Sequence, residues 1–381
     1  MNKTFWRDAL LAAVALAALI ALQRGATTIY ELPHGRFPAM MIEVAASRAI
    51  TFNPGVLGYY ERVFNAQARI SNHHGTWMGG GRVFDPYRIY SLRPNIENIG
   101  DWNSVNIPTN NFGHVGPNWS IQKPPNTRRV ALLGDSITEG FAVPTNQTYG
   151  ALFENRLNAT HPAGPSERFE IMNFAVAGYR LTQVFDVAEE DVPRFEPDVY
   201  VLGLTELSVF RGWDSHLVDM IALGIDPKYA FLRHTVEVAR TSAKDDDATL
   251  YAKLAPFRIA VVRDALLEMK SNAERHHAQF VVLLVPSVED ADVTKRRLKG
   301  IPELLASLNI TTVNLLDTFD QVPDVVPLRI SREDVHPNAK GQAMIAANLY
   351  AKLRAQPDAW ADIVGPAPAA AQQAASKHNS F

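Results

Sequence analysis

The chain has 381 residues, more than one domain usually holds, so we expect one large domain plus an accessory segment. Hydrophobic residues make up 47%, charged residues 20% and the net charge is −3, which excludes wholesale disorder and gives no general attraction to nucleic acid. The absence of cysteine excludes disulfides, thiolate metal sites and cysteine nucleophiles, so any nucleophile must be an oxygen or nitrogen group.

The N-terminus has the pattern of a targeting segment. Lys3 and Arg7 precede an uninterrupted apolar run from Ala9 to Leu22. This run fits a signal peptide better than a full membrane span, which needs about 17 to 25 residues. No small-x-small cleavage site ends it, so retention as an uncleaved anchor is an alternative. We predict that residues 1–26 are a signal peptide or membrane anchor. The protein is then exported: anchored in the inner membrane facing the periplasm or extracellular side, or secreted after cleavage.

Residues 27–127 have no regular apolar pattern. Three consecutive glycines at 79–81 and scattered prolines and asparagines indicate turns between short extended stretches. Pro124 and Pro125 cannot donate backbone hydrogen bonds and disfavour a helix before them. We predict a loop-rich accessory segment with short strands that ends in a stiff linker.

From residue 128 short apolar runs alternate with helical patterns, a texture typical of α/β proteins. The runs that predict strands are Arg129–Leu133, Phe169–Phe174, Pro197–Leu204, Phe280–Val285 and Thr311–Leu316. Nearly all-apolar strands separated by helices indicate a parallel sheet covered on both faces. We predict an α/β domain over residues 128–356, with a doubly wound parallel sheet flanked by helices.

Two stretches depart from this alternation. Between residues 210 and 249 the regular pattern lapses, and a long irregular insertion beside a site favours a cap or lid. Near the C-terminus the chain becomes rich in Pro, Ala, Gln and Ser, so we expect a disordered tail over residues 357–381.

Gly134-Asp135-Ser136 directly follows the first predicted strand. In an open parallel sheet the site lies at the carboxyl ends of the strands, where turns lead into helices. A serine there has an exposed hydroxyl and a backbone N–H near a helix N-terminus, which favours a developing oxyanion. The structural alternative is that Asp135 is a turn residue and Ser136 a helix cap.

A second polar segment lies near the other end of the domain. His336 precedes a predicted helix, with Glu333 and Asp334 three and two residues before it. A serine hydroxyl needs a base to take its proton, and an imidazole serves best when a carboxylate fixes its tautomer. We predict that Ser136 is a nucleophile and His336 its general base, with Glu333 or Asp334 as the acidic partner.

The blocks together resemble the SGNH hydrolases, also called GDSL-type esterases, and in particular an exported or membrane-anchored bacterial member. Gly134 to Gly140 (GDSITEG) is similar to the first block of that family, Asn173 to Tyr179 (NFAVAGY) to the second, and Glu333 to Asn338 (EDVHPN) to the last. The resemblance spans residues 128–353 and implies a flavodoxin-like three-layer fold.

The resemblance also implies roles for single residues. The backbone N–H groups of Ser136 and Gly178 would form the oxyanion hole, with Gly134, Asp135 and Asn173 in support. The family's third block, Gly-x-Asn-Asp, is represented only by Gly203 to Ser208 (GLTELS), which lacks the asparagine. Thr205, or alternatively Ser208, is the expected substitute donor.

We therefore expect a serine ester hydrolase that works through an acyl-enzyme, with a small-molecule or carbohydrate acyl ester as substrate. Two alternatives remain: an O-acyltransferase with the same triad, and a non-catalytic envelope protein that retains the fold. No metal or cofactor is expected, and the sequence does not indicate an oligomeric state.

Overall fold

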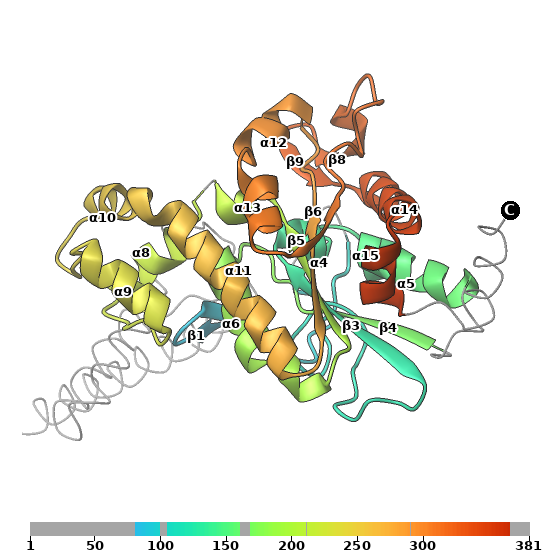
Figure 1. Ribbon diagram of the computed structural model, residues 1–381, viewed down its shortest axis with the longest axis horizontal. Coiled ribbons are helices and arrows are strands. Elements are labelled where there is room, and N and C mark those ends of the chain that lie inside the picture. Colours follow the sequence, from blue (N-terminus) through green and yellow to red (C-terminus); the bar gives the residue numbers. More distant parts are fainter. Residues whose placement is uncertain (1–80, 100–104, 161–167, 211, 290, 366–381) are drawn as a thin grey trace, which may run out of the picture. The chain divides into compact units, whose positions relative to one another are not determined.

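The computed structural model describes residues 81–99, 105–160, 168–210, 212–289 and 291–365 (Figure 1). The chain divides into two units, Met1–Phe84 and Asp85–Phe381, with strand β1 (Arg82–Asp85) at the boundary. The predicted signal or anchor segment, residues 1–26, lies outside the described residues, as does most of the predicted accessory segment. The described residues from Asp85 onward belong to the second unit.

A parallel sheet of five strands forms the centre of this unit (Figure 1). Its strands lie in the order β4-β3-β5-β6-β7: Arg168–Asn173, Thr127–Gly134, Val199–Leu204, Gln279–Leu284 and Thr311–Asn314. All residues of β5 are buried, because helices cover both faces of the sheet. The chain reverses its direction across the sheet between β3 and β5, and such a switch point opens a crevice at the carboxyl ends of the strands. The predicted α/β fold is confirmed.

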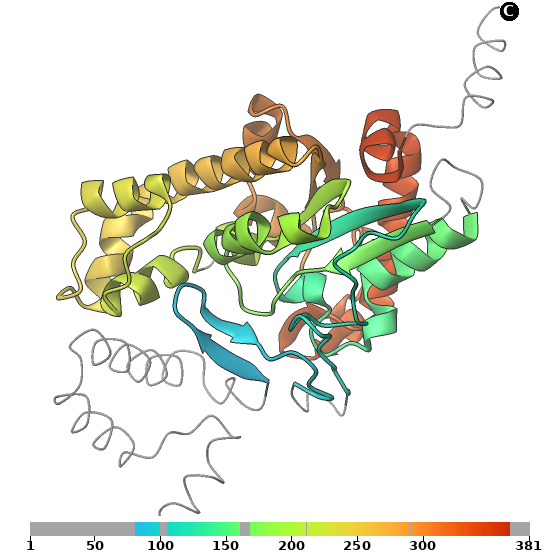
Figure 2. The ribbon, with the colours of Figure 1, turned by 90° about the horizontal axis from the view of Figure 1, so that it is seen from below.

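Helices cover the two faces of the sheet in separate layers (Figures 1 and 2). The helices α5 (Tyr149–Thr160), α14 (Ala339–Ala355) and α15 (Pro357–Val364) form one layer. The other contains α6 (Leu181–Glu190) and α11 (Arg258–Arg275), which pack against each other and against β3 and β6. Two shorter helices, α12 (Ala291–Arg297) and α13 (Ile301–Ser307), connect β6 to β7.

About half of the segment predicted as an insertion, residues 210–249, is helical. It contains α8 (Ser215–Ala222) and α9 (Ala230–Val238) and leads into α10 (Asp247–Leu254). These helices extend beyond the start of α11 (Figures 1 and 2) and share a hydrophobic cluster of their own. Its buried members are Trp213, Leu217, Val218, Ile221, Leu232, Leu250, Leu254 and Val261. A lid role for this segment stays a prediction.

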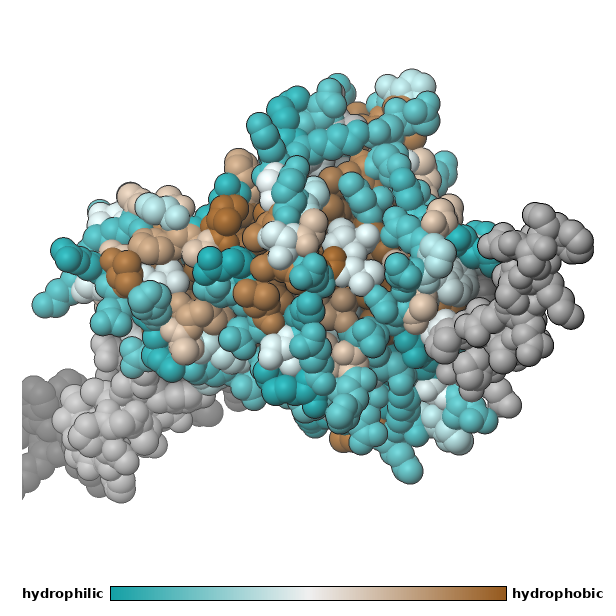
Figure 3. Space-filling view, in the orientation of Figure 1, coloured by the Kyte–Doolittle hydropathy of each residue, from teal (hydrophilic) through white to brown (hydrophobic). Residues whose placement is uncertain are grey.

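Most of the face shown in Figure 3 is hydrophilic, with apolar side chains gathered near its centre. Large exposed apolar side chains are few, and two of them, Ile259 and Leu267, lie on α11. In the described part of the chain, no helix has the length and hydropathy that a membrane span requires.

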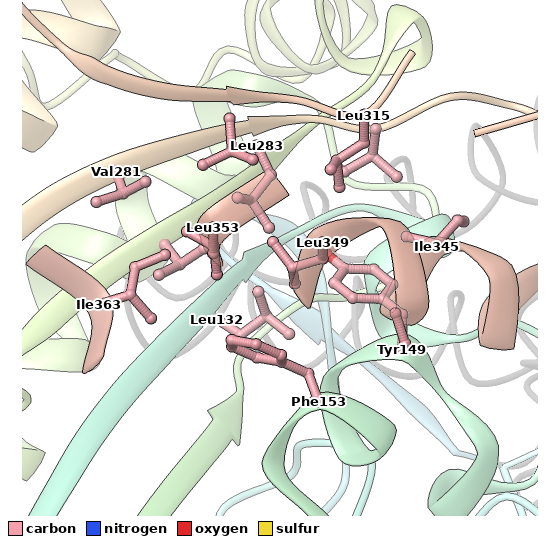
Figure 4. Close-up of a cluster of buried hydrophobic side chains, with 14 of the residues drawn as sticks. Leu132, Tyr149, Phe153, Val281, Leu283, Leu315, Ile345, Leu349, Leu353 and Ile363 are labelled. Carbon is pink, nitrogen blue, oxygen red and sulfur yellow. The ribbon is translucent and has the colours of Figure 1, made fainter. Parts of the chain in front are cut away.

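The main hydrophobic core lies between the sheet and the layer of α5, α14 and α15 (Figure 4). Alternate strand residues point toward this layer because successive side chains of a strand face opposite sides. On α14 the contacts recur at helical spacing, as in Leu349 and Leu353. The side chains labelled in Figure 4 are Leu132, Tyr149, Phe153, Val281, Leu283, Leu315, Ile345, Leu349, Leu353 and Ile363.

Helix α15 corrects one expectation. The prediction of a disordered tail from residue 357 is wrong for residues 357–364, and residues 366–381 lie outside the described part. Ala359 and Ile363, one helical turn apart, are buried in the main core. The Arg128 guanidinium donates hydrogen bonds to the carbonyls of Asp362 (2.6 Å) and Ile363 (2.7 Å). Pro357 stands in the first turn, where its missing N–H costs nothing.

Candidate active site

Ser136 lies at the switch point, directly after β3. It is the first residue of the one-turn helix α4 (Ser136–Glu139). Asp135 caps this helix, because its Oδ1 accepts a hydrogen bond from the Ile137 N–H (3.1 Å). Gly140 ends the helix with φ 86°, a left-handed conformation that favours glycine. The serine is thus held between two caps at the carboxyl edge of the sheet.

Ser136, His336 and Asp334 form a continuous chain of hydrogen bonds. The distance from Ser136 Oγ to His336 Nε2 is 2.6 Å, and that from His336 Nδ1 to Asp334 Oδ1 is 2.5 Å. The same Oδ1 also accepts the His336 backbone N–H (2.9 Å). Burial alone would raise the pKa of Asp334, but the hydrogen bonds and charge of His336 hold this pKa below its ordinary value. A hydroxyl, an imidazole and a carboxylate are therefore in contact, in the arrangement that nucleophilic catalysis by serine requires.

The second candidate carboxylate, Glu333, is not part of this chain. It precedes strand β9 (Asp334–Pro337), and its side chain is 91% exposed. The nearest cation is its neighbour Arg332, at 3.9 Å. Of the two carboxylates that the sequence left open, only Asp334 contacts the imidazole.

Strand β9 is held from two sides, and this fixes His336. It pairs in antiparallel fashion with β8 (Arg329–Ser331). From the loop after β6, the Val288 N–H donates to the Val335 carbonyl (2.8 Å), and Arg329 Nε donates to the Val288 carbonyl (2.8 Å). The Phe141 ring lies 5.0 Å from the imidazole, measured between ring centroids.

The second sequence block forms the loop after β4 and is bonded to α4. The Asn173 side chain donates to the Thr138 carbonyl (3.0 Å) and accepts the Ala175 N–H (3.1 Å). The Ala177 N–H donates to Glu139 Oε1 (3.0 Å). Asn173 is thus hydrogen-bonded to the helix that carries Ser136, which is compatible with its predicted supporting role.

The backbone N–H groups of Ser136 and Gly178 are the predicted donors to an oxyanion. Gly178 has φ 89°, and no acceptor for its N–H is found among the described residues. The Ser136 N–H belongs to the first turn of α4, where no intrahelical acceptor exists. Both groups lie on segments joined by the contacts of Asn173 and Ala177. The predicted use of Ser136 and Gly178 is compatible with this arrangement.

Thr205, predicted as a substitute donor to the oxyanion, makes other hydrogen bonds in the structure. It caps α7 (Glu206–Val209) by accepting the Leu207 N–H (3.1 Å), and its hydroxyl donates to Asp135 Oδ2. Ser208 Oγ donates to the same Oδ2 (2.7 Å). A hydroxyl group has a single proton. Because Asp135 accepts both protons, the structure does not present Thr205 or Ser208 as a donor to a reacting group.

The ends of β3 and β5 require glycine. Gly134 and Gly203 are partners in the parallel register, and Thr138 packs against both. A Cβ on Gly134 would lie 2.4 Å from Thr138 Oγ1, and one on Gly203 would lie 2.3 Å from it. Either distance is far below van der Waals contact. This steric requirement is compatible with the supporting role predicted for Gly134.

An ion-pair network that no sequence motif indicated lies beside the site. Glu206 is fully buried, and Arg297 Nη1 donates to its Oε1 at 2.9 Å. Arg297 also pairs with Glu289, in the loop after β6. These residues lie far apart in the sequence, and no local pattern connects them.

The strand order places a serine, bonded to a histidine and through it to a carboxylate, at the switch point of an α/β fold. Residues 130–349 match the model of the GDSL-like lipase/acylhydrolase family, and the chain belongs to this family. It is a hydrolase that acts on esters. No curated protein matches the chain.

Several solved structures are similar to it. One is of TesA, with 14% identity over 60% of this chain and 99% of that chain and a TM-score of 0.39. Another is of the psychrotrophic esterase EstA from Pseudoalteromonas sp., with 12% identity over 60% of this chain and 97% of that chain and a TM-score of 0.38. A catalytic mutant of Axe2, an acetylxylan esterase from Geobacillus stearothermophilus, has 15% identity over 59% of this chain and 93% of that chain and a TM-score of 0.40.

Proposed function

We propose that Ser136, His336 and Asp334 are the catalytic triad of this esterase. The observation that carries the proposal is the hydrogen-bond chain from Ser136 Oγ through both imidazole nitrogens to Asp334, with links of 2.6 Å and 2.5 Å. It supplies each group at the distance that proton transfer requires. Asp334 selects the tautomer in which Nδ1 bears the proton and Nε2 accepts.

In the acylation step, Ser136 Oγ attacks the ester carbonyl carbon and its proton moves to His336 Nε2. Asp334 stabilises the imidazolium that forms. As the tetrahedral intermediate collapses, the bond between carbon and the alcohol oxygen breaks, and that oxygen takes the proton from Nε2. The products are the free alcohol and an acyl group on Ser136.

Deacylation reverses the order of proton transfers. A water molecule attacks the acyl carbon and gives its proton to His336, which returns the proton to Ser136 Oγ when the acid leaves. In both steps the carbonyl oxygen becomes negative, and the N–H groups of Ser136 and Gly178 stabilise it. Loss of one such donor typically lowers the rate by about 100- to 1000-fold.

We extend the proposal to the substrate class, O-acyl groups of carbohydrate. Its support is the predicted export through residues 1–26, because an exported esterase meets the polysaccharides of the cell envelope. Membrane anchoring through this segment is part of the same proposal. Fractionation of cells that produce the full chain tests it, because an anchored protein stays with the membranes after a salt wash.

The triad is tested by hydrolysis of a p-nitrophenyl ester and by labelling with a serine-reactive phosphonate. We expect Ser136→Ala to lower kcat by at least about 1000-fold and to abolish labelling. Equal labelling of the wild type and Ser136→Ala would refute the proposed nucleophile. Absence of any labelling would favour the non-catalytic alternative. Transfer of the acyl group to an added sugar instead of water would favour the O-acyltransferase.

A further inference from the structure

The Asp135 carboxylate connects the two sides of the switch point. It is 2% exposed, and its two oxygens face different elements. On one side Oδ1 caps α4 at the Ile137 N–H (3.1 Å). On the other side Oδ2 accepts the hydroxyl protons of Thr205 and Ser208, which follow β5. Three hydrogen bonds therefore fix the carboxylate immediately before Ser136.

We propose that Thr205 and Ser208 are positioning residues for the reaction at Ser136. By holding Asp135 from across the switch point, they set the orientation of α4 and thereby of the Ser136 hydroxyl and N–H. The inference rests on the proposed triad and adds residues that do not touch the substrate. We call the three side chains Asp135, Thr205 and Ser208 the hydroxyl clamp.

Helix α7, which contains Ser208 and is capped by Thr205, is anchored by three arginines from different elements. Arg297 pairs with the buried Glu206 (2.9 Å). Arg180 donates to the Leu207 carbonyl (3.0 Å), and Arg258 donates to the Val209 carbonyl (3.3 Å). Hydrogen bonds from charged donors are stronger than neutral ones. The backbone that carries the Thr205 and Ser208 hydroxyls is thus held in place, and residues that position a catalytic group must themselves be held rigidly.

The clamp also explains how the site works with its altered third block. The hydroxyls that stand in that block give their protons to Asp135, so the proposed oxyanion hole consists of backbone N–H groups. A backbone donor moves only with its helix, and α4 is a single turn. A misplacement of about 1 Å costs on the order of 100-fold in rate. The orientation of α4 should therefore control kcat.

Removal of the hydroxyls tests this inference. We expect Ser208→Ala to lower kcat about 10-fold and the pair Thr205→Val, Ser208→Ala about 100-fold, with KM within about twofold of the wild type. Thr205→Ser, which retains the hydroxyl, should stay within about threefold. Thermal unfolding of each variant shows that it is folded. An effect on KM alone, or an unchanged kcat in the double variant, would overturn the proposal.

A matched control is Ser287→Ala. The Ser287 hydroxyl is buried after β6 at the same edge of the sheet, but it has no hydrogen-bond partner among the described residues. This variant should keep kcat within about twofold. Ser208→Ala should also have almost no further effect in an Asp135→Ala background, because the hydroxyl acts through that carboxylate. Undiminished loss of kcat in that background would contradict the clamp.

Amide hydrogen exchange separates this inference from the proposed function. The Ile137 N–H is bonded to Asp135, so Ser208→Ala should speed its exchange about 10-fold relative to the wild type and to Ser287→Ala. If the wild type hydrolyses no ester, the proposed function fails, and this exchange rate still decides the clamp. If the wild type is active and neither kcat nor exchange changes in Ser208→Ala, only the clamp fails.

Discussion

The choice between two neighbouring carboxylates depends on the local strand conformation. Asp334 and His336 are two residues apart on β9, so their side chains lie on the same face. Glu333 stands before the strand, and its side chain extends into solvent. Strand spacing therefore brings Asp334 to the imidazole, and a helical spacing of three would have favoured Glu333.

This difference gives a direct prediction. Asp334→Asn keeps the size of the side chain but removes the charge that stabilises the imidazolium and selects its tautomer. We expect kcat to fall by about 1000- to 10,000-fold with the protein still folded. The measurement is steady-state hydrolysis of a p-nitrophenyl ester by protein that shows a normal unfolding transition.

Glu333→Gln is the matched control, since it removes the same charge one residue away. Its side chain is 91% exposed, and we expect kcat to remain within about twofold. A large loss in Glu333→Gln with little loss in Asp334→Asn would show that the working enzyme uses the other carboxylate.

At the level of elements, the positions of the strands along the chain and their parallel arrangement were open to prediction from the sequence, but their order in the sheet was not. The blocks after the first two strands and before the last helix have local signals, because each places polar residues at the end of an apolar run. No local sequence pattern indicates that the hydroxyls of Thr205 and Ser208 bond to Asp135. Thr205 and Ser208 meet it only because β3 and β5 are neighbours in the sheet, a relation set by the whole topology.

Helix α15 failed prediction for a different reason. It has only eight residues and begins with a proline, so it lacks a periodic apolar pattern long enough to predict a helix. What makes it a helix here is burial of Ala359 and Ile363 against the core and the hydrogen bonds from Arg128. Tertiary packing, which a local pattern does not contain, stabilises it.

The helices α8 to α10 share with Val261 of α11 a hydrophobic cluster that is separate from the main core, so they should be open to separate destabilisation. Leu250→Ala removes a fully buried side chain from that cluster. We expect the free energy of unfolding to fall by about 2 to 5 kcal/mol, because the side chain leaves a cavity. Amide exchange should rise in α8 to α10, while the strands β3 to β6 stay protected.

Leu267→Ala is the comparison, since that leucine lies on α11 and is 40% exposed. It should change stability by no more than about 0.5 kcal/mol. Equal loss of protection in the strands and in α8 to α10 for Leu250→Ala would show that the two clusters unfold as one. If Leu250→Ala raises KM for the ester and leaves kcat unchanged, that result would support the predicted lid role of α8 to α10.

For the whole molecule, a buried histidine should make stability depend on pH. His114 is packed between aromatic rings, with Trp119 at 5.1 Å and Phe174 at 5.0 Å between centroids. The Asn110 side chain accepts its backbone N–H (3.0 Å), which fixes the loop around it. Burial lowers the pKa of His114 from 6.5 to about 4, because the charged imidazolium would lose its hydration.

The sign follows from proton linkage. Between pH 6.5 and about 4 the unfolded chain binds a proton at this histidine and the folded chain does not. Stability is therefore unaffected by His114 above pH 6.5 and decreases as the pH falls through this window, by up to about 1.4 kcal/mol per pH unit. His114→Phe keeps an aromatic ring at this position and removes the titration. We expect a flatter dependence of unfolding free energy on pH, measured by urea denaturation at several pH values.

His234→Phe is the control, because the histidine on α9 is exposed. This variant should show the same dependence of unfolding free energy on pH between pH 6.5 and 4 as the wild type. Other titrating groups contribute to this dependence in both proteins. The informative quantity is the difference in slope between His114→Phe and the wild type. If that difference is zero while His114→Phe remains folded, the histidine takes up its proton without unfolding, and the packing of this loop against Phe174 must open at acid pH before the sheet does.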